Sequence, residues 1–372
     1  RRALDSPTNW CRAVFKPTDK PRVFGVPPGA DFPAVVVREV LRRTAGAPPE
    51  DLARVRILVN TRRMQRRLIE LFSRDGARLL PRIGLVTELG PLVPDAPLPA
   101  PMPPLRRRLE LAQLIGALLS ADPSQAPRSA LFDLADSLAS LLDEMQGEGV
   151  GIDAIRALDT GDASGHWQRT QAFLSVVADY LSSIEERQAD PETLRALALH
   201  HVAARWADDP TETPVLVVGS TGSRGTTARL LELVAGLPLG AIVLPGFDTE
   251  LPEETWRILT DHPAPEDHPQ FRFAALLSRL GLRAGDVITW REGSVSDNRN
   301  ALISLSLRPA PVTNPWRDEG PELGRLTDAT SGLSLIEAPS QREEANAIAV
   351  ALREAVEAGK SAALITPDRT LG

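Results

Sequence analysis

The segment Arg22–Phe32 places a glycine-containing loop where phosphate chemistry is common in proteins. Residues 23–26 form a short apolar run that predicts a buried strand, and residues 33–43 predict a helix. A strand, a glycine-containing loop and a helix in this order form the phosphate site of P-loop proteins. Such a loop supplies backbone amides, a Lys for the terminal phosphates, and a Ser or Thr for Mg²⁺.

The loop in this chain lacks most of that chemistry. It contains one glycine, and an Asp and a Phe follow where Lys and Ser or Thr are needed. A carboxylate repels phosphate, and a phenyl ring does not bind a metal ion. We therefore predict a nucleotide-binding architecture with no nucleotide or other cofactor, and a degenerate P-loop at Pro28, Gly29, Ala30, Asp31 and Phe32.

Two further polar segments follow predicted strands and suit contact with a phosphate backbone. The first directly follows the apolar run 56–59, and the second is the loop 219–225, GSTGSRG. Hydroxyl and guanidinium groups at the start of a helix bind phosphate well. The candidate DNA contacts are Thr61, Arg62, Arg63, Arg66, Ser223 and Arg224.

Each of these segments also has a purely structural interpretation. Thr61 can cap a helix while its Arg neighbours remain solvated. The loop 219–225 can be a tight turn in which Gly222 and Gly225 supply positive φ angles. Both interpretations remain open at the level of sequence.

Charge and composition narrow the class of protein. The chain has 372 residues and a net charge of −7, yet residues 38–82 contain 12 Arg against 5 acidic residues. Basic charge gathered on one face can bind phosphate even in an acidic protein. Cys11 is the only cysteine, which excludes an internal disulfide and any multi-cysteine metal site; we predict no metal. No apolar stretch approaches the roughly 18 residues of a membrane span, and we expect a cytoplasmic protein.

The order of elements predicts an α/β protein with a parallel, doubly wound sheet that is interrupted by helices. Prolines concentrate at 90–104 and 308–332, which we interpret as linkers. The predicted divisions are an extended or disordered leader at 1–21, an α/β domain at 22–90 and 208–307, an all-helical insertion at 91–207, a linker at 308–332, and the start of a second α/β domain at 333–372.

That second α/β domain is predicted from one strand–helix–strand unit. Residues 333–337 and 362–365 are apolar runs, and a capping-box pattern from Ser340 to Glu343 opens the helix between them. The chain stops where another helix would follow, so we expect it to be a piece of a longer polypeptide.

This domain order resembles that of superfamily 1 helicases of the UvrD/Rep type, namely domain 1A, the 1B insertion, 1A continued, and 2A. Shorter motifs resemble the AddB family of double-strand-break repair proteins, which are inactivated relatives of these helicases. The motifs that carry the resemblance are residues 27–32, 58–63, 131–144, 217–224, 267–271 and 363–369.

The resemblance implies a module without motor chemistry. The Walker B position follows the strand 215–218, where Gly219, Ser220 and Thr221 stand instead of a carboxylate pair. The strand 241–244 leads into Pro-Gly-Phe-Asp and not into a Gln-bearing sensor. Members of the family pair with an AddA-type helicase–nuclease subunit and contact single-stranded DNA or duplex ends. Their nuclease and iron–sulfur cysteines belong to a C-terminal region that this chain does not contain.

Two other functions remain open from the residues alone. A divergent nucleotide hydrolase would need a Lys and a carboxylate pair at the strand ends, and neither is visible. A pure protein-interaction scaffold would bind no DNA, so salt-dependent DNA binding would distinguish it.

Overall fold

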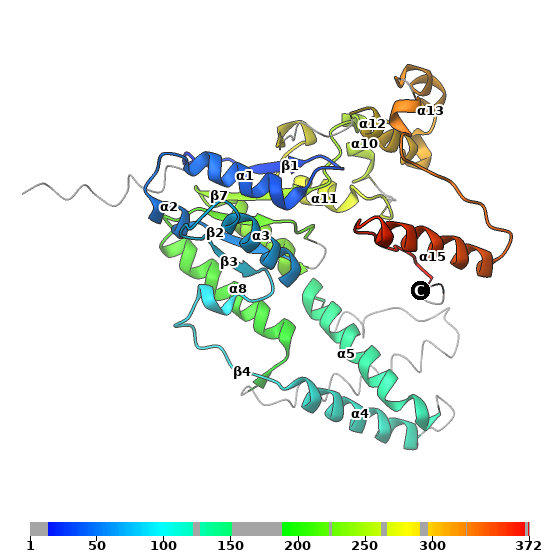
Figure 1. Ribbon diagram of the computed structural model, residues 1–372. Helices are drawn as coiled ribbons and strands as arrows, with labels where there is room; N and C mark the ends of the chain where they lie inside the picture. The colour runs from blue at the N-terminus through cyan, green and yellow to red at the C-terminus, as the bar shows by residue number, and fades with distance from the viewer. Residues whose placement is uncertain are drawn as a thin grey trace, which may run out of the picture.

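The computed structural model describes residues 14–121, 127–150, 188–222, 225–261, 266–290, 297–324, 326–368 and 371. Its central feature is a six-stranded parallel sheet (Figure 1). In spatial order the strands are β3 (Arg82–Leu85), β2 (Arg56–Val59), β6 (Val215–Val218), β7 (Gly240–Pro245), β1 (Val23–Val26) and β8 (Ile288–Thr289).

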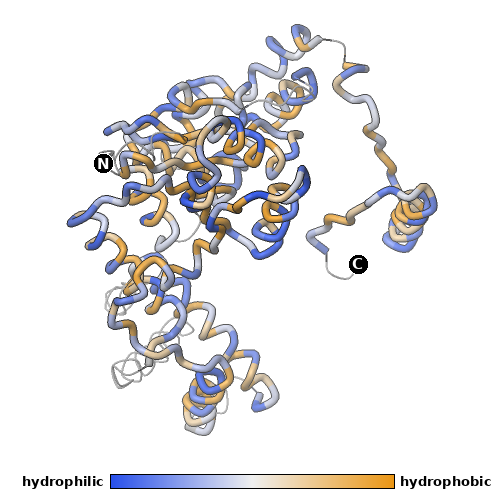
Figure 2. Tube along the Cα trace, turned by 60° about the vertical axis from the view of Figure 1, so that its left-hand side comes forward, coloured by the Kyte–Doolittle hydropathy of each residue, from blue (hydrophilic) through white to orange (hydrophobic). Residues whose placement is uncertain are grey.

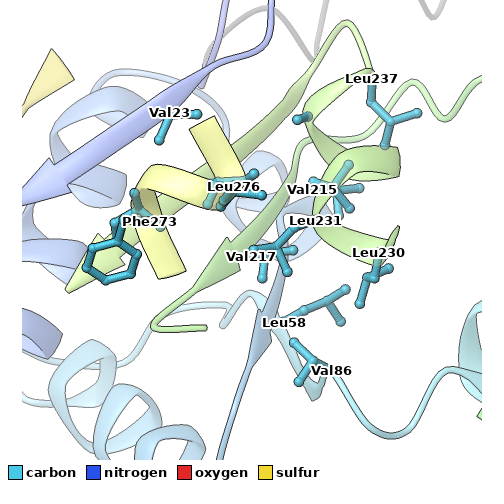
Figure 3. Close-up of a cluster of buried hydrophobic side chains, with 14 of the residues drawn as sticks. Val23, Leu58, Val86, Val215, Val217, Leu230, Leu231, Leu237, Phe273 and Leu276 are labelled. Carbon is cyan, nitrogen blue, oxygen red and sulfur yellow. The ribbon is translucent and has the colours of Figure 1, made fainter. Parts of the chain in front are cut away.

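Helices cover both faces of the sheet because successive strand residues are apolar and point to alternate sides. On one face, α1 (Phe32–Thr44), α2 (Pro49–Arg54) and α3 (Arg62–Ser73) pack on a core that includes Phe24, Ile57 and Leu216. On the other face lie α8 (Pro191–Asp208), α9 (Gly225–Ala235), α10 (Glu253–Ile258) and α11 (Phe271–Arg279). Figure 3 shows this second core, in which Leu230 and Leu231 of α9 lie near Val215 and Val217 of β6.

Part of the expected leader belongs to the core. Val14 and Phe15 are each 4% exposed and pack with the α1 side of the sheet. The Phe15 ring stacks on Phe24 at 5.8 Å, and the Arg22 guanidinium lies 4.5 Å from the Phe15 ring centroid. Residues 14–21 form neither helix nor strand, and these two adjacent apolar side chains hold the described end of the leader against β1. Residues 1–13 lie outside the described residues.

Helices lie between β3 and β6 in the chain. The segment contains η3 (Gly90–Leu92), β4 (Ala100–Pro101), α4 (Pro104–Ala121), η4 (Arg128–Ala130), α5 (Leu131–Glu148), β5 (Gln188–Ala189) and α8. Helices α4 and α5 form a small core of their own around Leu111, Ile115 and Leu142. Helix α8 instead contributes Val202 and Trp206 to the core of the sheet. Residues 151–187 of the predicted insertion fall outside the described residues.

The segment 308–332, expected to be a linker, contains short helices. They are η6 (Ala310–Val312), α13 (Pro315–Asp318), η7 (Gly320–Glu322) and α14 (Leu326–Ala329), and they follow η5 (Ala284–Asp286) and α12 (Asp297–Ser306). Several of its prolines stand in the first turn of a helix, where the missing N–H costs nothing. Trp316 Nε1 donates a 2.7 Å hydrogen bond to the Leu305 carbonyl and ties this segment to α12.

Only the helix of the predicted second α/β domain is present. α15 (Gln341–Glu357) begins with Ser340 as its N-cap, and the Ser340 hydroxyl accepts from the Glu343 amide at 3.3 Å. The strands predicted at 333–337 and 362–365 are not formed, because no neighbouring strand offers them hydrogen bonds. Leu335 and Ile365 are 86% and 94% exposed, and Figure 2 shows α15 apart from the sheet.

The chain is therefore an α/β protein with a doubly wound parallel sheet, compatible with a Rossmann-like or RecA-like fold. β1 and β6 are separated by β7 alone, so the loops that follow all three strands open at one edge of the sheet. Within the described ranges, no helix is both long enough and apolar enough to cross a bilayer.

Candidate functional site

The carboxylate of Asp31, a residue of the degenerate P-loop, lies at the N-terminus of α1. Asp31 is the N-cap of α1, and its Oδ1 accepts a hydrogen bond of 3.2 Å from the Ala34 amide. Arg67 of α3 approaches the other carboxylate oxygen, with Nη2 3.8 Å from Oδ2. An anion therefore already occupies the helix N-terminus at which a phosphate would bind.

The ring of Phe32 lies across the carboxyl edge of the sheet toward β6. A Cβ atom on Gly219, the residue directly after β6, would be 3.3 Å from Phe32 Cε1 and 3.8 Å from Asn60 Oδ1. The position of the Walker B carboxylate in a P-loop protein is thus bounded here by an apolar ring. Neither a phenyl ring nor a glycine supplies the side-chain oxygen that Mg²⁺ prefers.

Helix α12, which comes later in the chain, also contacts the loop of Pro28 and Gly29. Asn300 of α12 donates a side-chain hydrogen bond of 3.1 Å to the Pro28 carbonyl, across 272 residues of sequence. Gly29 has a φ of 83° at the turn, and a Cβ on it would meet no atom within 4 Å. Pro28 and Gly29 therefore form a turn with one tethered carbonyl.

The start of α3 combines a capped helix end with arginines. The Thr61 hydroxyl accepts a hydrogen bond of 3.2 Å from the Met64 amide, so Thr61 is an N-cap. Arg62 pairs with Glu88 across a distance of 2.5 Å, although its side chain remains 71% exposed. The capping interpretation is therefore correct for Thr61, and the Arg62 charge is partly neutralised by Glu88.

Arg63 and Arg66 are the cations at this site that remain available. Both are exposed, and neither makes a side-chain hydrogen bond or ion pair with another residue in the described part of the chain. They are three residues apart and so lie on neighbouring positions of the helix surface. Arg67 is engaged instead, because it pairs with Glu70 at 2.9 Å and approaches Asp31.

The loop after β6 is also held by a carboxylate. Glu148, the last residue of α5, accepts a hydrogen bond of 3.2 Å from the Gly225 amide at the start of α9. Gly222 has a φ of 65°, as predicted, but Gly225 does not have a positive φ. Gly225 is needed for close packing instead, since a Cβ there would lie 2.2 Å from the Gly147 carbonyl oxygen. Ser223 and Arg224 lie outside the described residues.

The buried side chains of Gln270 and His268 hold the loop after β7 in place. The sequence did not predict this role for either residue. Gln270 accepts from the Asp248 amide at 3.1 Å and donates to the Gly246 carbonyl at 2.9 Å. His268 Nδ1 accepts from the Gln270 amide at 3.1 Å. The motif at 267–271 stood out only through the family resemblance, and its physical role is to hold this loop.

The described residues contain no group of three His, Cys, Asp or Glu side chains that is arranged to hold a metal ion. Neither the protein-family models nor the curated proteins with which the sequence was compared give a match. The geometry of the sheet edge is thus the basis for assigning a function.

Proposed function

We propose that this chain is a non-catalytic, helicase-like module of a double-strand-break repair complex of the AddAB type. In this proposal the sheet is a 1A-like domain, the helices between β3 and β6 are a 1B-like insertion, and the segment after residue 332 begins a 2A-like domain. The module binds an AddA-type motor subunit as a heterodimer in the cytoplasm. It contacts single-stranded DNA or a duplex end with the exposed start of α3.

The observation that carries the proposal is the Asp31 carboxylate at the N-terminus of α1. A P-loop places phosphate against these backbone amides, and here a side chain of the protein takes that position. The second element of motor chemistry, a carboxylate pair after β6, is replaced by Gly219 and Ser220, and the Phe32 ring lies next to Gly219. The sheet retains the layout of a nucleotide-binding domain while its phosphate position is filled from within, which supports a structural role.

Arg63 and Arg66 support the DNA contact. Their guanidinium groups are exposed beside the positive end of a helix macrodipole, and neither is neutralised by a described carboxylate. Such groups bind backbone phosphates without reading the sequence of the bases.

The test is binding of a fluorescent dT15 oligonucleotide, followed by anisotropy between 50 and 200 mM NaCl. We expect the double variant Arg63→Ala/Arg66→Ala to weaken binding equally for dT15 and for mixed sequences. Loss of two phosphate contacts should also make the plot of log K against log [salt] less steep, with a slope smaller in magnitude by about 1.4. Arg74→Ala is the matched control, because Arg74 is exposed at the other end of the same helix. Equal loss in both variants, or no loss in the double variant, would remove the assignment.

Calorimetric titration with Mg²⁺–ATP separates this module from a divergent hydrolase. We expect no heat of binding up to millimolar ATP, since Asp31 would repel the phosphates. Micromolar binding of Mg²⁺–ATP would favour the divergent hydrolase over the non-catalytic module, whatever the result of the DNA titration.

A further inference from the structure

Three arginines converge at the opposite edge of the sheet, where the strands begin. Arg56 and Arg82 open β2 and β3, and Arg205 lies near the end of α8. All three line one cavity of about 580 Å³, which also includes residues of the loop that joins α8 to β6. This volume lies within the usual range of small-molecule sites.

The register of the sheet places two of these charges side by side. Arg56 and Arg82 are direct partners on adjacent parallel strands, so their side chains project from the same face. That face is the one covered by α8, because Leu58, two residues after Arg56, packs there with Trp206. Like charges at directly opposed strand positions destabilise a sheet, so this pairing has a cost for the fold.

No carboxylate in the described part of the chain forms an ion pair with Arg56 or Arg82. The side chains of Arg56 and Arg82 make no hydrogen bond or ion pair there, and Arg205 donates only to the Leu92 carbonyl, at 3.2 Å. Asp209 and Glu212 also line the cavity, but neither forms an ion pair with an arginine.

The electrostatics of Arg56 reflect this arrangement. Partial burial lowers the pKa of Arg56, and the positive charges of Arg82 and Arg205 lower it further. The half-buried guanidinium is thus destabilised by its neighbours in the absence of an anion. A ligand with two or more negative charges would relieve that repulsion.

We propose that the cavity formed by Arg56, Arg82 and Arg205 binds a phosphate-bearing ligand at the amino edge of the sheet. Guanidinium forks match the oxygen pairs of phosphate, and Pro91, Pro94 and Pro210 give the cavity stiff walls. The phosphate group belongs either to a small phosphorylated molecule or to a DNA backbone that passes this edge. The site is separate from the start of α3, so it stands or fails independently of the DNA contact proposed there.

The experiment uses the double variant Arg56→Gln/Arg82→Gln and calorimetric titration with sodium pyrophosphate at constant ionic strength. Neither side chain has a partner to lose, and removing like charges should leave the melting temperature unchanged or higher. We expect pyrophosphate to raise the melting temperature of the wild type but not that of the variant, and the affinity to fall about tenfold or more. Arg74→Gln, which alters an exposed arginine outside the cavity, is the control and should match the wild type.

A parallel titration with dT15 distinguishes the two sources of phosphate. Pyrophosphate binding that depends on Arg56 and Arg82 supports a small phosphorylated ligand. Weaker dT15 binding by the variant, without any pyrophosphate binding, identifies DNA as the source of the same group. The proposal is overturned when wild type, variant and control bind both probes equally, or when none of them binds either probe.

Discussion

The carboxylate of Glu148, at the end of α5, accepts a hydrogen bond of 3.2 Å from the backbone amide of Gly225, at the start of α9. The contact joins α5, which lies between β3 and β6 in the chain (Figure 1), to a helix that packs on the sheet. It repeats the arrangement at α1, where Asp31 caps the helix. Two helices that follow strands at the carboxyl edge of the sheet therefore both begin at an internal carboxylate.

Replacement of Glu148 should loosen the connection between α5 and α9. We expect Glu148→Ala to lower the free energy of unfolding by about 0.5–1.5 kcal/mol, because the Gly225 amide loses a charged acceptor. Urea denaturation followed by circular dichroism measures the change. Glu144→Ala, on the same helix and exposed, should stay within about 0.5 kcal/mol of the wild type. Equal costs for the two variants would contradict the capping role.

Asp31 should act through its hydrogen bond more than through its charge. Asp31→Ala removes the cap of α1 and is expected to cost about 1 kcal/mol, whereas Asp31→Asn keeps an acceptor and should cost less. Asp75→Ala, in the exposed turn after α3, controls for loss of an acidic residue. Chemical denaturation of the three variants gives the order. An equal loss in Asn and Ala variants would show that the charge facing Arg67 dominates.

Gly225 should tolerate no side chain. In Gly225→Ala the new Cβ would meet the Gly147 carbonyl oxygen at 2.2 Å, so α5 must shift away from α9. We expect a loss of about 1–3 kcal/mol, the usual cost of overpacking. Gly285→Ala adds the same methyl group where no atom lies within 4 Å. Thermal melting of both variants measures the contrast, and a Gly225→Ala protein as stable as Gly285→Ala would refute the close approach.

His268 should make the fold sensitive to mild acid. Burial lowers the pKa of His268 and the Arg308 cation lowers it further, although the backbone of Leu307 and the carboxylates of Asp248 and Asp267 oppose the shift. The depressed pKa means that the folded state disfavours the protonated imidazole. This stability is present above the ordinary His pKa of about 6.5 and is lost as the pH falls through the folded value.

The variant His268→Asn removes this titration. We expect the urea midpoint of the wild type to fall more steeply between pH 7.5 and pH 5.5 than that of the variant. His200→Asn, which alters an exposed histidine on α8, should keep the wild-type slope. Parallel profiles for wild type and His268→Asn would show that His268 protonates freely in the folded protein.

Most of the sheet was predictable from sequence because its strands are short apolar runs between polar or glycine-containing flanks. The runs at 23–26, 56–59, 215–218 and 241–244 are buried on both faces, which is what a parallel sheet under helices requires. The runs at 333–337 and 362–365 carry the same local signal but find no partner strand. A strand depends on a neighbour that its own residues do not specify.

In the candidate site, too, features that depend on neighbouring residues were predictable, and contacts between distant residues were not. Local chemistry placed Thr61 at the start of a helix and identified the degenerate loop, since both depend on residues a few positions apart. The contacts of Glu148 with Gly225 and of Asn300 with Pro28 span 77 and 272 residues. The sequence pattern does not predict such pairs, because they form only when separate elements pack together.

The position of β1 in the sheet constrains how the chain can be made. Val26 is fully buried between partners that come much later, since β1 pairs with residues 242–245 of β7 and with β8. At roughly 5–20 residues per second, a ribosome needs roughly 11–44 s to reach the partner strand after Val26 is joined to the chain. During that interval β1 lacks the β7 strand with which it pairs, so this part of the sheet is completed only after residues more than 200 positions later have been made.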